Sequence, residues 1–191
     1  MKELQSGKLI STMDNYDIKV WIKKNNTLEC EFTLKNGGKS YDILEVRKNE
    51  VVALSGNNIN FYDLNKRDKI NSISGFEGHN FNPGKKFCLV NHELLLFCGS
   101  DNIFLVDYKA YQLINKIACE KIITLYKLSS NCIFSGQENG DIKQWQCNGR
   151  DTKLYSYKKE AHTNFICLIF RLNNQIFTGD NFGNIKFWDL K

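Results

Sequence analysis

Three histidines are the residues of this chain best suited to acid–base or metal chemistry. His79, His92 and His162 are the only histidines among the 191 residues, and imidazole is the side chain whose ordinary pKa lies nearest neutral pH. Catalysis would also need a convergent carboxylate pair, or a nucleophile with its base. The sequence displays neither, so we expect no catalytic residue and no enzyme activity.

Seven cysteines offer a second possible chemistry. The sequence has no Cys-x-x-Cys pair, which a zinc site would normally supply. Most of the cysteines fall within or beside predicted strands, where a free thiol behaves as a small apolar side chain. We therefore expect neither a metal nor a cofactor. The cysteines are Cys30, Cys88, Cys98, Cys119, Cys132, Cys147 and Cys167.

Composition and charge narrow the classes of function further. The formal net charge is +5, but the lysines are dispersed, whereas phosphate binding needs them gathered on one surface. Nucleic acid is therefore not the expected partner. The odd number of cysteines and the absence of an apolar N-terminal segment favour the cytoplasm, with the nucleus as the alternative. No apolar run approaches the length of a membrane span.

A repeated pattern covers nearly the whole chain. Each copy begins with Asn or Asp followed by Ile. It ends either at Trp or at an aromatic or aliphatic residue that is followed by Asp. The intervals between the Ile residues are 41, 44, 39 and 43 residues. The five copies occupy residues 17–21, 58–63, 102–107, 141–145 and 184–189.

Each copy forms the second half of a predicted β-hairpin. A short apolar run precedes it, and the turn between them is usually rich in Gly, Asn and Asp, which tolerate positive φ. Further apolar stretches before and after give about four short strands per period. We therefore expect an all-β propeller of four-stranded antiparallel blades in a single domain, 1–191. The hairpins are expected near residues 9–24, 51–64, 94–108, 132–147 and 175–190.

The repeat resembles that of the WD-repeat family, which has a period of about 40 to 45 residues and Gly-His and Trp-Asp signatures. Gly78-His79 and Ala161-His162 stand 28 and 27 residues before an Asp, and Trp188-Asp189 is the one full Trp-Asp pair. Kelch propellers are the nearest alternative, but their paired glycines do not recur. The resemblance implies structural roles for His79, His162, Trp21, Trp145, Trp188, Asp63, Asp107 and Asp189.

The chain also departs from the family pattern. Asn36 and Cys119 stand at expected His positions, and Phe182 stands at the expected turn Asp position. The family's His, Ser/Thr, Asp and Trp network is then complete in no blade. Only residues 1–5 precede the turn at 6–8 that leads into the first hairpin, so three complete blades are expected, with a partial blade at each end. Propellers of this family usually close with six to eight blades, so the resemblance implies a segment of a longer ring, with the remaining blades in the same or a partner chain. A closed five-bladed ring remains an alternative, and it would need another strand in the first blade.

The resemblance implies a non-catalytic scaffold that binds a protein or peptide within a larger assembly. The alternatives are a repeat arm of a larger enzyme, such as a kinase or ubiquitin ligase, and, less favoured, a nucleic-acid-binding propeller. The usual contact face carries the turns within the hairpins and the connections between blades. Phe165 there is either a binding anchor or a residue packed within its blade. The implied contact positions are Phe165, Cys167, Asn181, Ile122, Thr124, Glu138 and Asp14.

Overall fold

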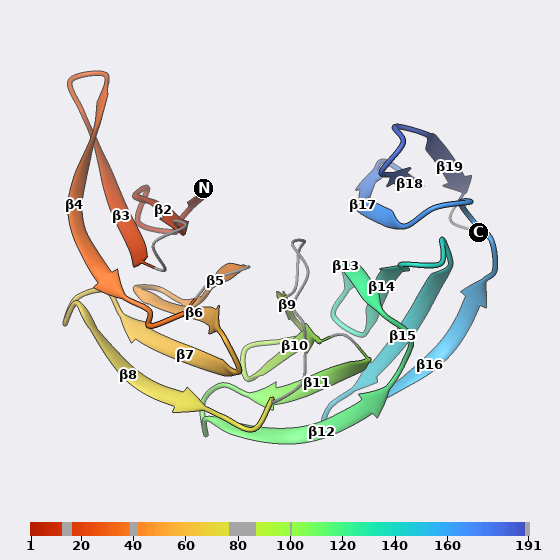
Figure 1. Ribbon diagram of the computed structural model, residues 1–191, viewed down its shortest axis with the longest axis horizontal. Coiled ribbons are helices and arrows are strands. Elements are labelled where there is room, and N and C mark those ends of the chain that lie inside the picture. The colour runs from red at the N-terminus through yellow and green to blue at the C-terminus, as the bar shows by residue number, and fades with distance from the viewer. Residues whose placement is uncertain (13–16, 39–41, 77–86, 100, 190–191) are drawn as a thin grey trace. The chain divides into compact units, whose positions relative to one another are not determined.

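The computed structural model describes residues 1–12, 17–38, 42–76, 87–99 and 101–189. Within those ranges the chain is built from strands alone, arranged in five antiparallel sheets whose strands pair in chain order (Figure 1). No helix of the described part is long and apolar enough to cross a membrane. The chain divides into two compact units, residues 1–78 and 79–191. We call the sheets blades 1 to 5.

The first unit contains two four-stranded blades. Blade 1 consists of β1 (Lys2–Glu3), β2 (Leu9–Thr12), β3 (Asp17–Lys24) and β4 (Thr27–Lys35). Blade 2 consists of β5 (Ile43–Arg47), β6 (Glu50–Ser55), β7 (Asn58–Asp63) and β8 (Asp68–Ile73).

The second unit contains three blades, of which the last has three strands in the described residues. Blade 3 consists of β9 (Phe87–Leu89), β10 (Leu94–Cys98), β11 (Asn102–Asp107) and β12 (Gln112–Ala118). Blade 4 consists of β13 (Ile122–Ser129), β14 (Cys132–Gln137), β15 (Ile142–Asn148) and β16 (Asp151–Lys158). Blade 5 consists of β17 (Ile166–Leu172), β18 (Gln175–Asp180) and β19 (Ile185–Asp189).

Tight turns set the register of each meander. Asn25 and Asn26 join β3 to β4, and their φ angles are 47° and 65°. Positive φ at both residues is typical of a two-residue hairpin turn whose twist matches that of the flanking strands. The third strand of blades 1 to 4 also carries a register shift immediately before its Trp, Tyr or Val position, as at Gln144/Trp145. The same irregularity therefore recurs at the same place in each complete repeat.

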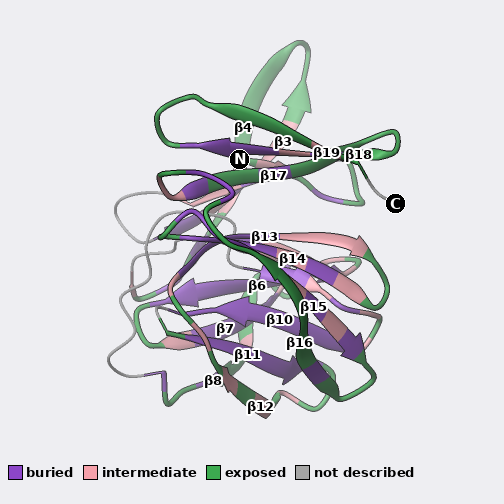
Figure 2. Ribbon diagram, turned by 90° about the vertical axis from the view of Figure 1, so that its right-hand side faces the viewer, coloured by how far each residue is buried: buried purple, intermediate pink, exposed green. Residues whose placement is uncertain are grey.

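The apolar core lies within and between neighbouring blades of each unit. In the second unit one buried cluster joins blades 3 and 4, and another joins blades 4 and 5. Blades 1 and 2 share a third cluster. Figure 2 shows that β10 and β11, the two middle strands of blade 3, are buried, whereas β16 of blade 4 is largely exposed. Burial between sheets, and not within one sheet alone, stabilises this fold.

The expected all-β architecture with four-stranded antiparallel blades is confirmed, but the expected number of complete blades is wrong. Four blades have four strands, because β1 supplies the inner strand of blade 1 by pairing with Leu9 and Ile10. Lys2 anchors that strand through its Nζ atom, which lies 2.6 Å from Oδ1 of Asp42. Leu4, directly after the strand, is buried. Two residues held in this way are too few to give a periodic signal in the sequence.

Candidate functional site

A buried chain of hydrogen bonds crosses blade 5. Nδ1 of His162 lies 3.2 Å from Oδ2 of Asp180, and Nε2 lies 2.7 Å from Oγ1 of Thr178. The indole Nε1 of Trp188 donates to the same Oγ1 at 2.8 Å. Because a carboxylate can only accept, Nδ1 of His162 carries the shared proton, and in the neutral imidazole Nε2 accepts from the Thr178 hydroxyl.

This network corrects the expectation that no blade completes it. The acidic residue of the network is Asp180, at the end of β18, and it does not stand at the expected position, which Phe182 occupies. Oδ1 of Asp180 accepts from the backbone N–H groups of Phe182 and Asn184 at 3.0 and 2.9 Å. The turn acid therefore stands two residues earlier than the family pattern places it.

Asp180 is held as a carboxylate by its neighbours. The pKa of Asp180 is lowered to about 2, and the hydrogen bond from the side-chain amide of Asn184 has the largest effect, against the opposing effect of burial. Backbone N–H groups of the turn and the imidazole of His162 act in the same direction. A carboxylate that accepts several hydrogen bonds is stabilised in its charged form.

The order carboxylate, imidazole, hydroxyl is also the order of a nucleophilic triad, so its accessibility decides its role. Thr178 is 0% exposed and His162 is 1% exposed. The Thr178 oxygen is already occupied by the indole of Trp188 and by His162. A substrate carbonyl cannot reach that oxygen, so the network ties the segment before β17 to β18 and β19 and is not an active site.

Blades 4 and 1 retain part of the same arrangement. Trp145 donates to Oγ of Ser135 at 2.7 Å, and Trp21 donates to Oγ of Ser11 at 2.9 Å. In blade 4, Gln137 replaces the acid and donates to Ser135 at 2.6 Å. Cys119 stands at the His position, and burial raises the pKa of its thiol to about 12. That thiol is therefore poorly suited to nucleophilic chemistry.

Blade 2 has hydrogen bonds between the equivalent positions, but they are made by different side chains. Asn36 stands at the His position and Tyr62 at the Trp position. The Tyr62 hydroxyl donates directly to Oδ1 of Asn36 at 2.6 Å, without a bridging hydroxyl. Ser55 donates to the backbone oxygen of Asn36 at 2.6 Å. Burial of Tyr62 raises its pKa to about 12.

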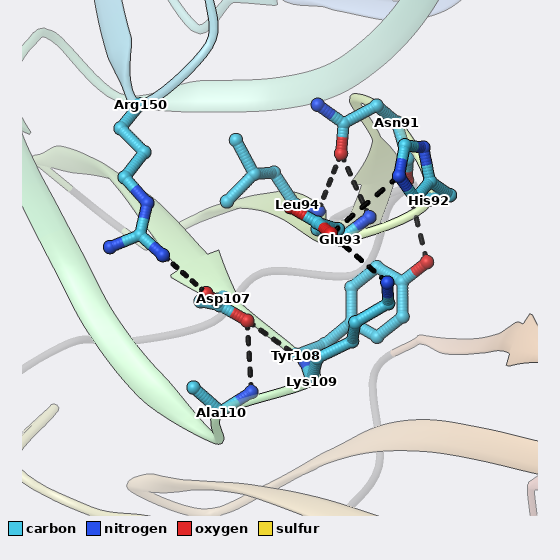
Figure 3. A network of polar contacts seen from close by, with 9 residues as sticks. All are labelled: Asn91, His92, Glu93, Leu94, Asp107, Tyr108, Lys109, Ala110 and Arg150. Carbon is cyan, nitrogen blue, oxygen red and sulfur yellow. Dashed lines mark hydrogen bonds and ion pairs between the residues drawn. The ribbon is translucent and has the colours of Figure 1, made fainter.

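The aspartates of the Trp-Asp positions shape the outer turns. Oδ1 of Asp107 accepts from the backbone N–H groups of Lys109 and Ala110 at 3.0 and 2.9 Å, and its Oδ2 accepts from Arg150 at 2.9 Å (Figure 3). Asp63 caps the N–H groups two and three residues later in the same way. Asp189 instead accepts from the side chain of Gln175 at 3.0 Å.

His92 lies in the same network near the turn that precedes β10. Its Nε2 is 3.6 Å from Oε1 of Glu93, and its side chain is 82% exposed. Lys109 approaches the same Glu93 oxygen at 3.0 Å and lowers the pKa of Glu93 (Figure 3). These exposed groups form a surface ion-pair cluster. The described residues hold no group of three or more His, Cys, Asp or Glu side chains that could bind a metal ion.

A second feature is a rim formed by turns of blades 4 and 5. We define the turn rim as the hairpin turns at 138–141 and 181–184 with the inter-blade segments at 119–121 and 161–165. The backbone N–H of Glu138 donates to the oxygen of Lys121 at 2.9 Å, and that of Asn181 donates to the oxygen of Phe165 at 3.3 Å. Each hairpin turn is thus fixed to the connection that enters its own blade.

The two blades are also joined along this rim. The N–H of His162 donates to the oxygen of Gly140 at 2.9 Å. Gly140 has a φ of +83°, and a Cβ there would lie 1.9 Å from the backbone oxygen of His162. Only glycine allows this approach, so the rim is a continuous backbone surface across blades 4 and 5.

The residues expected to contact a partner differ in their exposure. Glu138, Cys167 and Asn181 are exposed, and Phe165 is partly exposed. Ile122 and Thr124 are 0% and 3% exposed, so they pack within the unit and offer no contact surface, contrary to expectation. Asp14, like His79, lies outside the described residues. Sequence reasoning missed Phe182, which is 72% exposed on the rim.

Comparison with known proteins identifies the fold and no more. No model of a protein family matches the chain, and no curated protein matches it. A chain in the crystal structure of the mitotic checkpoint complex is similar, with a TM-score of 0.78 and 15% identity over 95% of this chain and 58% of that one. The computationally designed Ika8 protein gives a TM-score of 0.73 and 19% identity over 96% of this chain and 55% of that one.

The chain therefore spans a little over half the length of these two solved chains. At such low identity the likeness concerns the fold alone. Together with the five meander sheets, it fits a β-propeller fold.

Proposed function

We propose that the chain is a non-catalytic interaction scaffold, and that the turn rim of blades 4 and 5 binds a protein or peptide partner. The observation that carries the proposal is the position of Phe182. Its side chain is 72% exposed in a turn whose backbone is fixed by Asp180. Aromatic side chains are enriched among the residues that contribute most to binding at protein–protein interfaces.

The surroundings of Phe182 fit peptide recognition. Phe165 lies on the neighbouring connection, because its backbone oxygen accepts from the N–H of Asn181. The exposed ion pair of Lys121 and Glu138, at 2.5 Å, lies on the same rim in blade 4. An apolar anchor beside polar groups is the usual composition of a protein–protein contact.

The buried network supports a scaffold as well. It uses His162, the one described histidine that has a carboxylate and a hydroxyl partner, to hold blade 5 together. The rim turns are therefore mounted on a preorganised sheet, which reduces the entropic cost of binding.

A peptide library displayed on phage and selected against the immobilised 191-residue chain would test this proposal. Selected peptides should lose at least about tenfold in affinity when Phe182 is replaced by Ala, which corresponds to a hot-spot loss above about 1.4 kcal/mol. Tyr155→Ala is the matched control, because Tyr155 is 65% exposed on β16, away from the rim. Peptides that bind Phe182→Ala as well as the parent chain would refute the rim site.

A further inference from the structure

The outer strand of blade 4, β16, carries exposed aromatic and basic side chains close together. Tyr155 and Tyr157 are 65% and 54% exposed. Lys153 precedes them, and Lys158 and Lys159 follow them. β16 is the edge strand of its sheet, and Figure 2 shows it exposed along most of its length. Lysines are dispersed over the chain as a whole, but here three of them lie within seven residues.

The three lysines of this segment are not neutralised by carboxylates. Within the described residues their side chains make no ion pair, whereas Lys143 on the adjacent strand is paired with a glutamate. The ammonium group of Lys159 instead lies 6.0 Å from the centre of the Tyr157 ring. Asp151 and Glu160 stand at the two ends of the segment, so the stretch that contains the tyrosines is positively charged.

A bulge in β16 exposes one of the two rings. Tyr155 lies between two residues that pair with the consecutive residues Trp145 and Gln144 of β15, so it is the extra residue of the bulge. The extra residue of β12 in blade 3 is Ile114, which packs against the apolar cluster. Bulges commonly redirect a side chain. In blade 4 an aromatic ring is therefore presented to solvent at a position that blade 3 uses for packing.

We infer that β16 and Lys159 form a stacking surface for single-stranded nucleic acid. Tyr155 and Tyr157 each stack on a base, and the three lysines contact phosphates. Proteins that bind single strands without sequence preference combine these two kinds of contact. The surface is separate from the turn rim. Tyr155→Ala should therefore weaken the binding of nucleic acid and leave the binding of peptides at the turn rim unchanged.

The spacing of the rings favours a single strand over a duplex. Residues two positions apart on a strand are separated by about 7 Å, which is about twice the 3.4 Å rise between neighbouring nucleotides of a duplex. Bases that stack on both rings must therefore be drawn apart, as only an unpaired strand allows. An acidic peptide or an anionic lipid surface would also attract the lysines, but neither carries planar bases to cover the rings.

Fluorescence anisotropy with labelled oligonucleotides tests the role of the rings. The probes are oligouridine and oligodeoxyuridine of about twelve nucleotides, within the usual size of single-strand sites, and they differ only in the 2′-hydroxyl that distinguishes RNA from DNA. Tyr155→Ala and Tyr157→Ala should each lose at least about fivefold in affinity. Tyr157→Phe keeps the ring and should stay within about twofold of the parent chain. Phe187→Ala is the matched control, because Phe187 is 60% exposed on β19.

The dependence of affinity on salt tests the role of the lysines. Three phosphate contacts on a single strand predict a slope of about −2 for log K against log salt concentration, at about 0.7 per contact. Lys159→Ala should reduce that slope by about 0.7. Lys69→Ala is the matched control, because Lys69 is also an exposed lysine of an outer strand, β8, and should leave the slope unchanged.

Three results would overturn the inference. Equal affinities of the parent chain and Tyr157→Ala for both oligonucleotides would show that the ring does not contact a base. A duplex bound as tightly as the single strands would show that only phosphates are recognised. Tighter binding to a polyglutamate peptide, or to vesicles that contain phosphatidylserine, would identify a different anionic partner. None of these results depends on peptide binding at the turn rim.

Discussion

The two interfaces between blades of the second unit are built at equivalent positions with different side chains. Between blades 3 and 4, Leu105 and Ile117 help to form an apolar cluster in which Trp145 is 2% exposed. Between blades 4 and 5, the corresponding positions are Gln144 and Lys158, and they line a cavity of about 370 Å³. Trp188 there is partly exposed.

Polar networks show the opposite trend. Blade 3 has Phe97 where blade 5 has Thr178, and Phe97 stacks on Phe104 with centroids 4.6 Å apart. Blade 5, whose interface is looser, has the complete Asp, His, Thr and Trp network. A blade of this repeat can therefore be stabilised either by apolar packing between sheets or by hydrogen bonds within one sheet.

The largest expected effect is at the tightly packed interface. Trp145→Ala should lower the free energy of unfolding by about 3 to 5 kcal/mol, because it empties a large buried site. Trp188→Ala should cost less, since part of its indole already contacts solvent. Urea unfolding of both variants gives the two values. A loss below about 1 kcal/mol for Trp145→Ala would show that the comparison of the interfaces is mistaken.

The repeat in the sequence was sufficient to predict the strands, because alternating residues and turn residues report local structure directly. It also pointed to Trp145 and His162 as structural positions. It was not sufficient to predict β1. That two-residue strand is held by the ion pair of Lys2 with Asp42, which is distant in the sequence, and by the burial of Leu4. Nor could it identify Asp180, because the length of the turn after β18 differs from the family pattern.

The candidate site was predicted less well than the fold. The family resemblance implies contact positions such as Ile122 and Thr124 from their place in the repeat, and that place carries no information about whether a neighbouring blade covers the side chain. Both are buried. Phe182 stands where the family pattern expects a turn acid, and that pattern gives no sign that its side chain is exposed. Burial between blades depends on residues about 40 positions apart, and no local pattern reports it.

The second prediction concerns the hydroxyl at the centre of the blade 5 network. Thr178→Val keeps the shape but removes the oxygen that Trp188 and His162 share. The loss should be about 1 to 3 kcal/mol, because buried polar groups then lack a partner. A double-mutant cycle with Trp188→Phe measures the coupling. Strictly additive losses in the cycle would show that the indole and the hydroxyl do not stabilise each other.

The third prediction uses acid to weaken the same network. The pKa of Asp180 is lowered from 3.8 to about 2, so its contribution to stability is fully present above about pH 4 and is lost as the pH falls toward 2. Asp180→Asn should therefore reduce the dependence of unfolding on pH within that window. Asp151→Asn, at an exposed position, is the control. Equal slopes for the parent chain and Asp180→Asn would contradict the assignment.

The smallest expected effect belongs to a double variant that gives the loose interface the apolar residues of the tight one. Gln144→Leu with Lys158→Ile restores the apolar pair found at Leu105 and Ile117, and filling a cavity of this kind commonly adds about 0.5 to 2 kcal/mol. Gln144 also loses its bond from Ser156, so we expect a net gain near 1 kcal/mol in urea unfolding. Lys153→Ile, on the same strand but outside the cavity, should give no comparable gain. A double variant less stable than the parent would mean that the polar lining stabilises this interface, and that the cavity is not a packing defect.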